Sequence, residues 1–252
     1  ESGDEVGQLA DSFNLMAESL EETEKRRKEF IANISHDLRS PLTSIQGFIE
    51  AIADGTIPAE KQGYYLKIVL EETGRLSKLA NDLVDLSSAQ AGAMVLERCD
   101  FDINELIRET IDSMEPRFNK KDIHVNAVFA DEVTIVNADP NKIKRVLQNL
   151  IDNAIKFSYE GGNINVEVQE KDKKAVVYVR DDGKGITDEE MKHVFERFFK
   201  ADASRGLDKT GVGLGLSIVK EFVNAHNERV DVRSLPEGGT EFMFTLMSVN
   251  KK

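Results

Sequence analysis

The first third of the chain is dominated by a helical spacing of apolar positions. From Val6 to Phe48 apolar residues recur every three or four positions, which is the period of a helix with one buried face. The charge-dense stretch 21–29 separates two halves of this stripe; it can stay helical through pairs of opposite charges but buries little. The pattern therefore predicts one long helix.

A second helical stripe follows a short break. The turn residues at 54–58 interrupt the period, and apolar positions resume at helical spacing from Leu66 to Leu86. Two long helices joined by a short connection predict an antiparallel α hairpin. Because a hairpin alone has too little core, we expect two copies to pair as a dimeric four-helix bundle, which makes the chain a homodimer.

After Gly92 the pattern changes to short strand-like runs that alternate with helices. Helices are predicted at 103–118, 140–157 and 214–226, and strands at 123–130, 133–136, 164–169, 175–179, 229–234 and 241–247. The strands come in consecutive pairs between the helices, which favours antiparallel neighbours. The second part is therefore predicted to be an α+β sandwich, with a mixed, mostly antiparallel sheet and helices on one face.

Charge and composition exclude several classes of protein. The 33 Lys+Arg against 46 Asp+Glu give a net charge of −13, which argues against a nucleic-acid partner because phosphate backbones would be repelled. A hydrophobic fraction of 40% over 252 residues can build two folded units. The single cysteine, Cys99, excludes a disulfide framework and a Cys-based zinc site, and a reducing cytosol fits best.

No stretch approaches the roughly 18 to 20 apolar residues that cross a bilayer, and the first residues do not resemble an export signal. The chain begins at Glu1 within a helical pattern. We therefore expect a fragment of a longer protein, in which any membrane anchor lies upstream.

Three glycines precede the last helical run: Gly211, Gly213 and Gly215. Glycines before a helix leave backbone N–H groups accessible to an anion such as a phosphate. Their spacing matches neither the dinucleotide fingerprint nor the Walker loop. A glycine-rich surface loop explains these residues equally well at this point.

A second glycine-containing loop follows a predicted strand. Asp181 stands before Gly183 and Gly185, where a carboxylate can accept a hydrogen bond from an exocyclic amine while the glycines admit a flat ring. An ordinary tight turn explains the same residues.

The predicted helix 140–157 carries Asn149 and Asn153 four residues apart on one face, with Lys156 nearby. Amide oxygens can bind Mg²⁺ together with phosphate oxygens, and the lysine adds positive charge. Solvated polar residues on a helix are the alternative interpretation.

In the first long helix, His36 is followed directly by Asp37. The carboxylate can hold the imidazole in one tautomer, which leaves the other ring nitrogen as a nucleophile. A histidine in a helix is more often structural, so the pair alone leaves both interpretations open.

Taken in order, these motifs resemble those of the sensor histidine kinases of bacterial two-component systems. The matching segments are the H box (His36, Asp37, Arg39, Pro41, Leu42), the N box (149–158), the G1 box (181–186), the F box (194–200), the G2 box (211–216) and the last glycine motif (238–242). The resemblance covers nearly the whole chain. It implies the end of a HAMP linker and a signalling helix at 1–22, a dimerisation and histidine phosphotransfer domain at 23–92, and a catalytic ATP-binding domain of the Bergerat type at 93–252.

The resemblance implies an enzyme that uses ATP and Mg²⁺. Asn153 is then the Mg²⁺ ligand, and Asp181 reads the adenine amino group. The segment between the F and G2 boxes is implied to be a lid. The full set of implied ATP-binding residues is Asn149, Asn153, Lys156, Asp181, Gly183, Gly185, Phe195, Phe198, Lys200, Arg205, Lys209, Gly211, Gly213, Gly215, Leu216 and Thr240.

By the same resemblance, His36 is the phosphoacceptor and Asp37 its base or orienting group. The phosphoryl group then passes to an aspartate in the receiver domain of a response regulator. Ser40 stands where relatives carry Thr or Asn that orients a water, so phosphatase activity toward that regulator is a further expectation. Asp182, where many relatives have Asn or Thr, adds negative charge beside the base pocket.

Other interpretations remain. A chaperone-like or topoisomerase-like ATPase of the same fold would not need His36 and Asp37 in a helical hairpin. A degenerate kinase that acts as a dimeric scaffold would be expected to lack a required group, and none is missing. A fragment locked in one signalling state stays open. The resemblance also implies that the full-length protein is membrane-anchored, with this part on the cytoplasmic side of the membrane.

Overall fold

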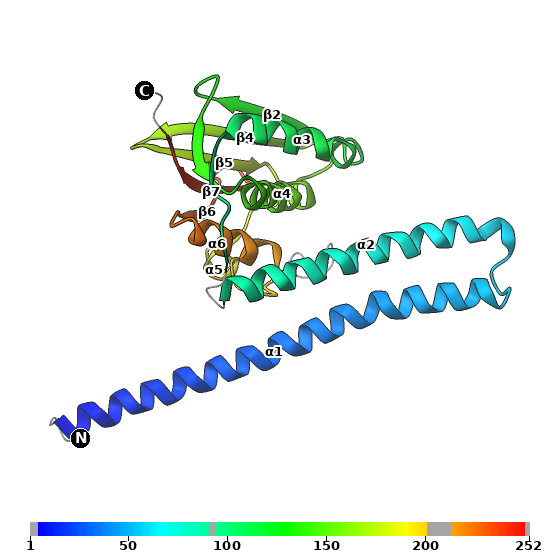
Figure 1. Cartoon of the computed structure of the whole chain (residues 1–252), viewed down its shortest axis with the longest axis horizontal. Helices are drawn as coiled ribbons and strands as arrows, with labels where there is room; N and C mark the ends of the chain where they lie inside the picture. Colours follow the sequence, from blue (N-terminus) through cyan, green and yellow to red (C-terminus); the bar gives the residue numbers. More distant parts are fainter. Residues whose placement is uncertain (1–4, 91–93, 201–212, 250–252) are drawn as a thin grey trace. The chain divides into compact units, whose positions relative to one another are not determined.

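The computed structural model describes residues 5–90, 94–200 and 213–249, and its contacts divide the chain into two units, at 1–80 and 81–252. The first unit consists of α1 (Glu5–Ala53) and most of α2 (Ala59–Gln90), which form an antiparallel hairpin (Figure 1). At its turn Gly55 adopts a φ of 78°, and the backbone N–H of Ile57 donates to the carbonyl of Ala51 over 2.8 Å. The predicted hairpin is confirmed.

The hairpin leaves large apolar side chains exposed in the single chain. They follow the stripes seen in the sequence, and they are Leu9, Phe13, Met16, Leu20, Leu42, Leu66 and Leu70. Exposed apolar surface of this extent is typical of a face that another molecule covers.

The second unit is built around a five-stranded sheet in the order β2-β4-β5-β7-β6. Only β2 and β4 are parallel; the other neighbours are antiparallel. Its strands are β2 (His124–Phe129), β4 (Asn163–Lys171), β5 (Lys174–Asp181), β6 (Val230–Ser234) and β7 (Thr240–Met247), while β1 (Cys99–Asp102) and β3 (Ile135–Ala138) form a separate antiparallel pair.

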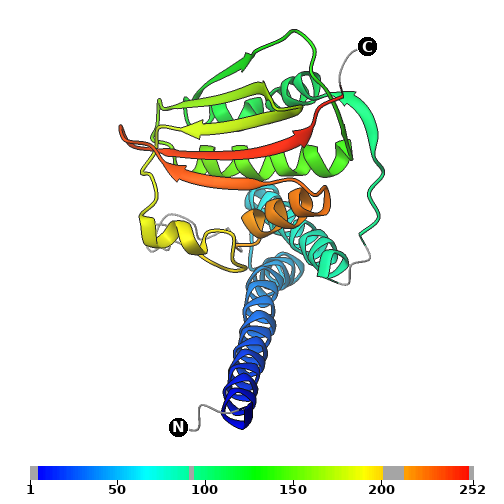
Figure 2. The same ribbon diagram turned by 90° about the vertical axis from the view of Figure 1, so that its left-hand side faces the viewer.

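Helices cover one face of this sheet, as Figure 2 shows for the green helix α4 behind the strands. They are α3 (Ile103–Asn119), α4 (Pro140–Phe157) and α6 (Gly215–Ala225), and the short α5 (Asp188–His193) follows β5. The core lies between the sheet and these helices, where side chains such as Leu147, Phe222 and Phe244 are fully buried. The predicted sandwich with helices on one face is confirmed.

The expectation that strands pair with their neighbours in sequence is right for β4 with β5 and for β6 with β7, and wrong for β2 with β3. The sequence pattern missed β1, which is only four residues long and half exposed. Because β1 provides an antiparallel partner for β3, β3 leaves the main sheet and β2 pairs in parallel with β4.

The N-terminus of α4 is held by a cap. The side chain of Asp139 accepts hydrogen bonds from the backbone N–H groups of Asn141 (3.0 Å) and Lys142 (3.1 Å), and Pro140 opens the helix. This is the favoured chemistry of a helix start, and it sets the beginning of the helix that carries the two candidate asparagines.

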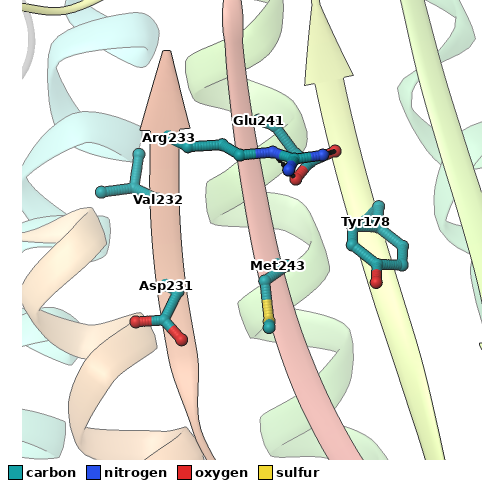
Figure 3. Close-up of a pocket in the computed structure, with 6 residues that line it drawn as sticks. All are labelled: Tyr178, Asp231, Val232, Arg233, Glu241 and Met243. Carbon is teal, nitrogen blue, oxygen red and sulfur yellow. Dashed lines mark hydrogen bonds and ion pairs between the residues drawn. The ribbon is translucent and has the colours of Figure 1, made fainter. Parts of the chain in front are cut away.

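The other face of the sheet carries a ladder of charges. Arg180 on β5 pairs with Glu167 on β4 and with Glu241 on β7, which also accepts from Arg233 on β6. A shallow pocket of about 200 Å³ lies beside this ladder, where Figure 3 shows the guanidinium group of Arg233 next to Glu241. Because side chains alternate along a strand, Asp181 lies on the opposite face from Arg180, so this pocket is separate from the candidate site described next.

Candidate functional site

Helix α4 carries both candidate asparagines. Asn149 is buried, and its Nδ2 has no hydrogen-bond partner among the described residues. Asn153 is half-buried one turn further along the helix, and Lys156 follows it, with its ammonium group 4.6 Å from the centre of the Phe157 ring. A buried amide donor without a partner is costly, and it fits a hydrogen bond to a bound ligand.

Asp181 ends β5 with a buried carboxyl group. It accepts hydrogen bonds from the backbone of Gly183 (3.0 Å) and of Thr240, its partner across the β5–β7 ladder. The pKa of Asp181 is raised to about 6, mainly by burial and also by the nearby charge of Asp182, although these hydrogen bonds lower it. The carboxyl group therefore titrates close to neutral pH.

Two glycines around Asp181 stand where no side chain fits. A Cβ on Gly183 would lie 2.2 Å from the carbonyl oxygen of Phe157, and a Cβ on Gly239 would lie 2.0 Å from that of Asp181. The loop after β5, the end of α4 and the start of β7 thus meet backbone to backbone. Gly185, with a φ of 70°, continues this loop.

The start of α6 lies beside Asn149. A Cβ added to Gly215 would be 3.4 Å from Asn149 Oδ1, and Leu216 follows in the first helical turn. The first turn of any helix has backbone N–H groups without partners inside the helix, and these attract anions. Helix α4 therefore touches both glycine loops, one at Asn149 and the other at Phe157.

The two ends of the predicted lid also meet. The backbone N–H of Phe198 donates to the carbonyl of Gly213 over 2.9 Å, and both residues have positive φ. Phe195 packs edge-on against Phe242 with ring centres 6.3 Å apart, and Lys200 is half-buried. Three implied lid residues, Arg205, Lys209 and Gly211, fall at 201–212, outside the described residues.

His36 lies on α1 in the other unit. Its side chain is 83% exposed, and its Nδ1 is 3.1 Å from Asp37 Oδ1. If Nδ1 carries the proton, it donates to the carboxylate, and Nε2 keeps a free lone pair directed to solvent. Ser40 is exposed one turn further along the helix.

Two features escaped the sequence analysis. Asp182 does more than add charge, because its carboxylate accepts from the backbone N–H (2.8 Å) and the side-chain amide (2.9 Å) of Asn163 at the start of β4. The contact of Gly183 with the carbonyl of Phe157 was also missed, since a main-chain oxygen leaves no signal in the sequence.

The described residues contain neither a side-chain cluster for a metal ion nor a membrane-spanning helix. Within the described ranges, no three His, Cys, Asp or Glu side chains gather as a metal-binding cluster. Mg²⁺ often takes only one or two protein ligands and completes its shell with phosphate and water, so the asparagine amides suit it without such a cluster. In the same ranges, no helix combines the length with the apolarity that a membrane span needs.

Comparisons with known proteins identify two related domains along the chain. The model of the His Kinase A (phospho-acceptor) domain matches residues 26–92, and that of the histidine kinase-, DNA gyrase B- and HSP90-like ATPase matches residues 138–250. Sensor histidine kinase YclK of Bacillus subtilis is 35% identical over 97% of this chain and 53% of its own length. The chain spans about half the length of the curated relatives it matches.

Solved structures show the same architecture. The histidine kinase AdeS of Acinetobacter baumannii superposes with a TM-score of 0.70 at 25% identity, over 85% of this chain and 98% of that one. Histidine kinase ThkA, in complex with response regulator protein TrrA, gives 0.68 at 28% identity, over 92% of this chain and 66% of that one.

The chain belongs to the sensor histidine kinase family of two-component systems. The family resemblance drawn from the sequence motifs is confirmed.

Proposed function

We propose that this chain is an autokinase that binds ATP in its second unit, phosphorylates His36 and passes the phosphoryl group to an aspartate of a response-regulator receiver domain. One observation carries the proposal: Asn149, whose buried Nδ2 has no partner among the described residues, lies beside the start of α6, and the C-terminal end of the same helix contacts the loop after Asp181. A site bounded in this way suits a nucleotide, with its base at Asp181 and its phosphates at Asn149.

The proposed roles in nucleotide binding follow from these positions. The carboxylate of Asp181 accepts from the adenine amino group, and Gly183 and Gly185 allow the flat base to approach the backbone. Asn149 donates to a phosphate oxygen, and Asn153 provides an amide oxygen to Mg²⁺, with Lys156 adding positive charge. When bound, the ion neutralises phosphate charge during transfer.

For phosphoryl transfer, the protein mainly has to position the attacking group and the phosphate. The ring of His36 carries its proton on Nδ1, which donates a hydrogen bond to Asp37. The unprotonated Nε2 attacks the γ-phosphorus. A P–N bond forms as the bond from the γ-phosphorus to the β,γ-bridging oxygen breaks, and ADP leaves. Asp37 keeps its hydrogen bond to Nδ1 and offsets the positive charge that develops on the ring.

The partners are part of the proposal. The exposed stripes of the hairpin suit a second copy of the chain, and the solved complex of ThkA with TrrA supports a response regulator as the phosphoryl acceptor. Ser40, one helical turn after His36, is proposed to position a water for phosphatase activity toward that regulator.

The place of this chain in its full-length protein is also proposed. Residues 1–22 would end a HAMP linker and 23–92 would form the dimerisation and phosphotransfer domain. Residues 93–252 would form the catalytic domain, on the cytoplasmic side of a membrane-anchored receptor. The share of the curated relatives that lies outside the matched region leaves room for a sensor and an anchor.

Incubation with γ-labelled ATP and Mg²⁺ tests the proposal. We expect acid-labile, alkali-stable label on the wild type and none on His36→Gln or Asn153→Ala. The matched control is His124→Gln, which changes an exposed histidine on β2 and should keep the label. Label that persists in His36→Gln would assign the phosphoacceptor elsewhere, and ATP binding without any label would favour a signalling scaffold.

A further inference from the structure

Helix α4 ends without the glycine that closes many helices. Its last residue is Phe157, and the following residue, Ser158, is extended with a ψ of 154°. The last four carbonyls of a helix have no partner within it and must be satisfied by other groups. One of them, the carbonyl of Ala154, accepts from the backbone N–H (2.9 Å) and the hydroxyl (2.6 Å) of Ser158.

A lysine from a distant part of the chain satisfies two further carbonyls. The ammonium group of Lys121, on the loop between α3 and β2, donates to the carbonyls of Ile155 (2.7 Å) and Lys156 (3.0 Å), and also to that of Ser158. An ammonium group has three protons, so these three contacts account for all of them. The positive charge also opposes the negative end of the helix dipole.

The backbone of Lys121 also holds the segment that follows α4. Its carbonyl accepts from the N–H of Gly161 over 3.2 Å, in the turn that leads from α4 to β4. Main chain and side chain together hold the end of α4 and the turn after it against the loop at 119–123.

The last turn of α4, which Lys121 holds, is part of the candidate nucleotide site. It carries Lys156, and it ends at Phe157, whose carbonyl oxygen leaves no room for a side chain on Gly183. Gly183 in turn donates its N–H to Asp181. A movement of the last turn of α4 would therefore pass directly to the group proposed to read the adenine.

We infer that Lys121 is a positioning residue for nucleotide binding, which acts through the carbonyls at the end of α4 and makes no contact of its own with the nucleotide. This inference rests on the proposed function of the site. It predicts an effect on affinity for adenine nucleotides, with little effect on the chemical step once the site is filled, because His36 and Asn149 stay in place.

The test compares Lys121→Met, which removes the ammonium group and keeps the stem, with Lys120→Met, which removes an exposed neighbouring charge. In the full chain, we expect the dissociation constants of both ATP and ADP to rise about ten-fold in Lys121→Met. The labelling rate of His36 at saturating ATP should stay within about two-fold of the wild type, and Lys120→Met should match the wild type.

A third variant, Lys121→Gln, keeps the inference testable if Lys121→Met does not fold. Lys121→Gln keeps two N–H donors but loses the positive charge and part of the side-chain length. We expect it to lose less nucleotide affinity than Lys121→Met does. If Lys121→Met does not fold, unchanged affinity in a folded Lys121→Gln would overturn the inference.

Other results would also test the inference on Lys121. Unchanged affinity in a folded Lys121→Met, or an equal loss in Lys120→Met, would overturn the inference. A loss for ATP but not for ADP, or a slower labelling rate at saturation, would place the effect at the transferred phosphate instead of the base and would also overturn it. If the wild type itself binds no ATP, the proposed function fails, which is a separate result.

Discussion

At the scale of single residues, Asp181 shows a conflict between stability and binding. Its carboxyl group is buried next to a second carboxylate, so ionisation is unfavourable in the free protein, whereas the proposed role needs a strong acceptor. Such a conflict between local stability and chemistry is common where a group serves binding.

The substitution Asp181→Asn should separate the two effects. The folded pKa of about 6 lies above the ordinary value of 3.8, so the ionised form costs stability at pH 7, by up to about 3 kcal/mol. We expect Asp181→Asn to raise the free energy of unfolding by about 1 to 3 kcal/mol while ATP affinity falls about 10- to 100-fold. Urea unfolding and nucleotide titration at pH 7 measure both quantities, and a variant less stable than the wild type would contradict this account of the carboxyl group.

The same carboxyl group predicts a pH dependence. As the pH falls through about 6, Asp181 takes up a proton and becomes a weaker acceptor, so ATP affinity should fall. Phosphate groups of ATP titrate nearby, and the Asp181→Asn variant corrects for them because it keeps every other group. The ratio of the two affinities should shrink toward acid pH; a constant ratio would mean that Asp181 does not titrate there.

At the scale of secondary-structure elements, His226 joins two helices of the second unit. Its Nδ1 lies 2.7 Å from the carbonyl of Phe222 on α6, and its Nε2 accepts from the backbone N–H of Asp139, the cap of α4, over 3.0 Å. These two bonds require a neutral ring with the proton on Nδ1. A protonated ring would direct a second N–H at another N–H.

Burial lowers the pKa of His226, with the charge of Arg98 adding to the effect and those of Asp139 and Glu228 opposing it. The unfolded chain therefore binds the proton more readily, and stability is lost as the pH falls below the ordinary value of 6.5. We expect His226→Gln to cost about 1 to 2 kcal/mol at pH 7.5, through imperfect hydrogen bonds, and less at pH 5.5. Denaturant unfolding at the two pH values checks this, with His124→Gln as the exposed control; a cost that is equal at both would contradict it.

The elements that were predicted from the sequence have clear physical signatures. Helix 140–157 was predicted with correct bounds because Asp139 and Pro140 mark its start and its apolar face is regular. The strand β1 and the short helix α5 were missed because four to six residues give no readable period.

The candidate site was also predictable only in part. Its side chains belong to sequence motifs and could be predicted, whereas its closest contacts involve backbone atoms and could not. The carbonyl of Phe157 is far in sequence from Gly183, and the three carbonyls at 155, 156 and 158 are far from Lys121, so only the fold brings these groups together.

At the scale of the whole molecule, the exposed stripes of the hairpin predict the state of association. Leu70 is 71% exposed in the single chain and belongs to the apolar stripe of α2. Because an exposed leucine contributes little to the fold of one chain, Leu70→Glu should leave its helix content unchanged. In a dimeric bundle, by contrast, the same change would bury a charge among apolar side chains, which is strongly unfavourable.

We therefore expect the wild type to sediment as a dimer, and Leu70→Glu to weaken the dimer at least about 100-fold, on the basis of two unpaired buried carboxylates per dimer. The control is Val95→Glu, which places the same charge on a residue that is 82% exposed and lies outside the stripe. If His36 is labelled within one chain, the monomer should still be labelled; if it is labelled across the dimer, labelling should fall with the dimer fraction. A wild-type monomer, or equal weakening by both substitutions, would mean that the stripe of α2 is not the dimer interface.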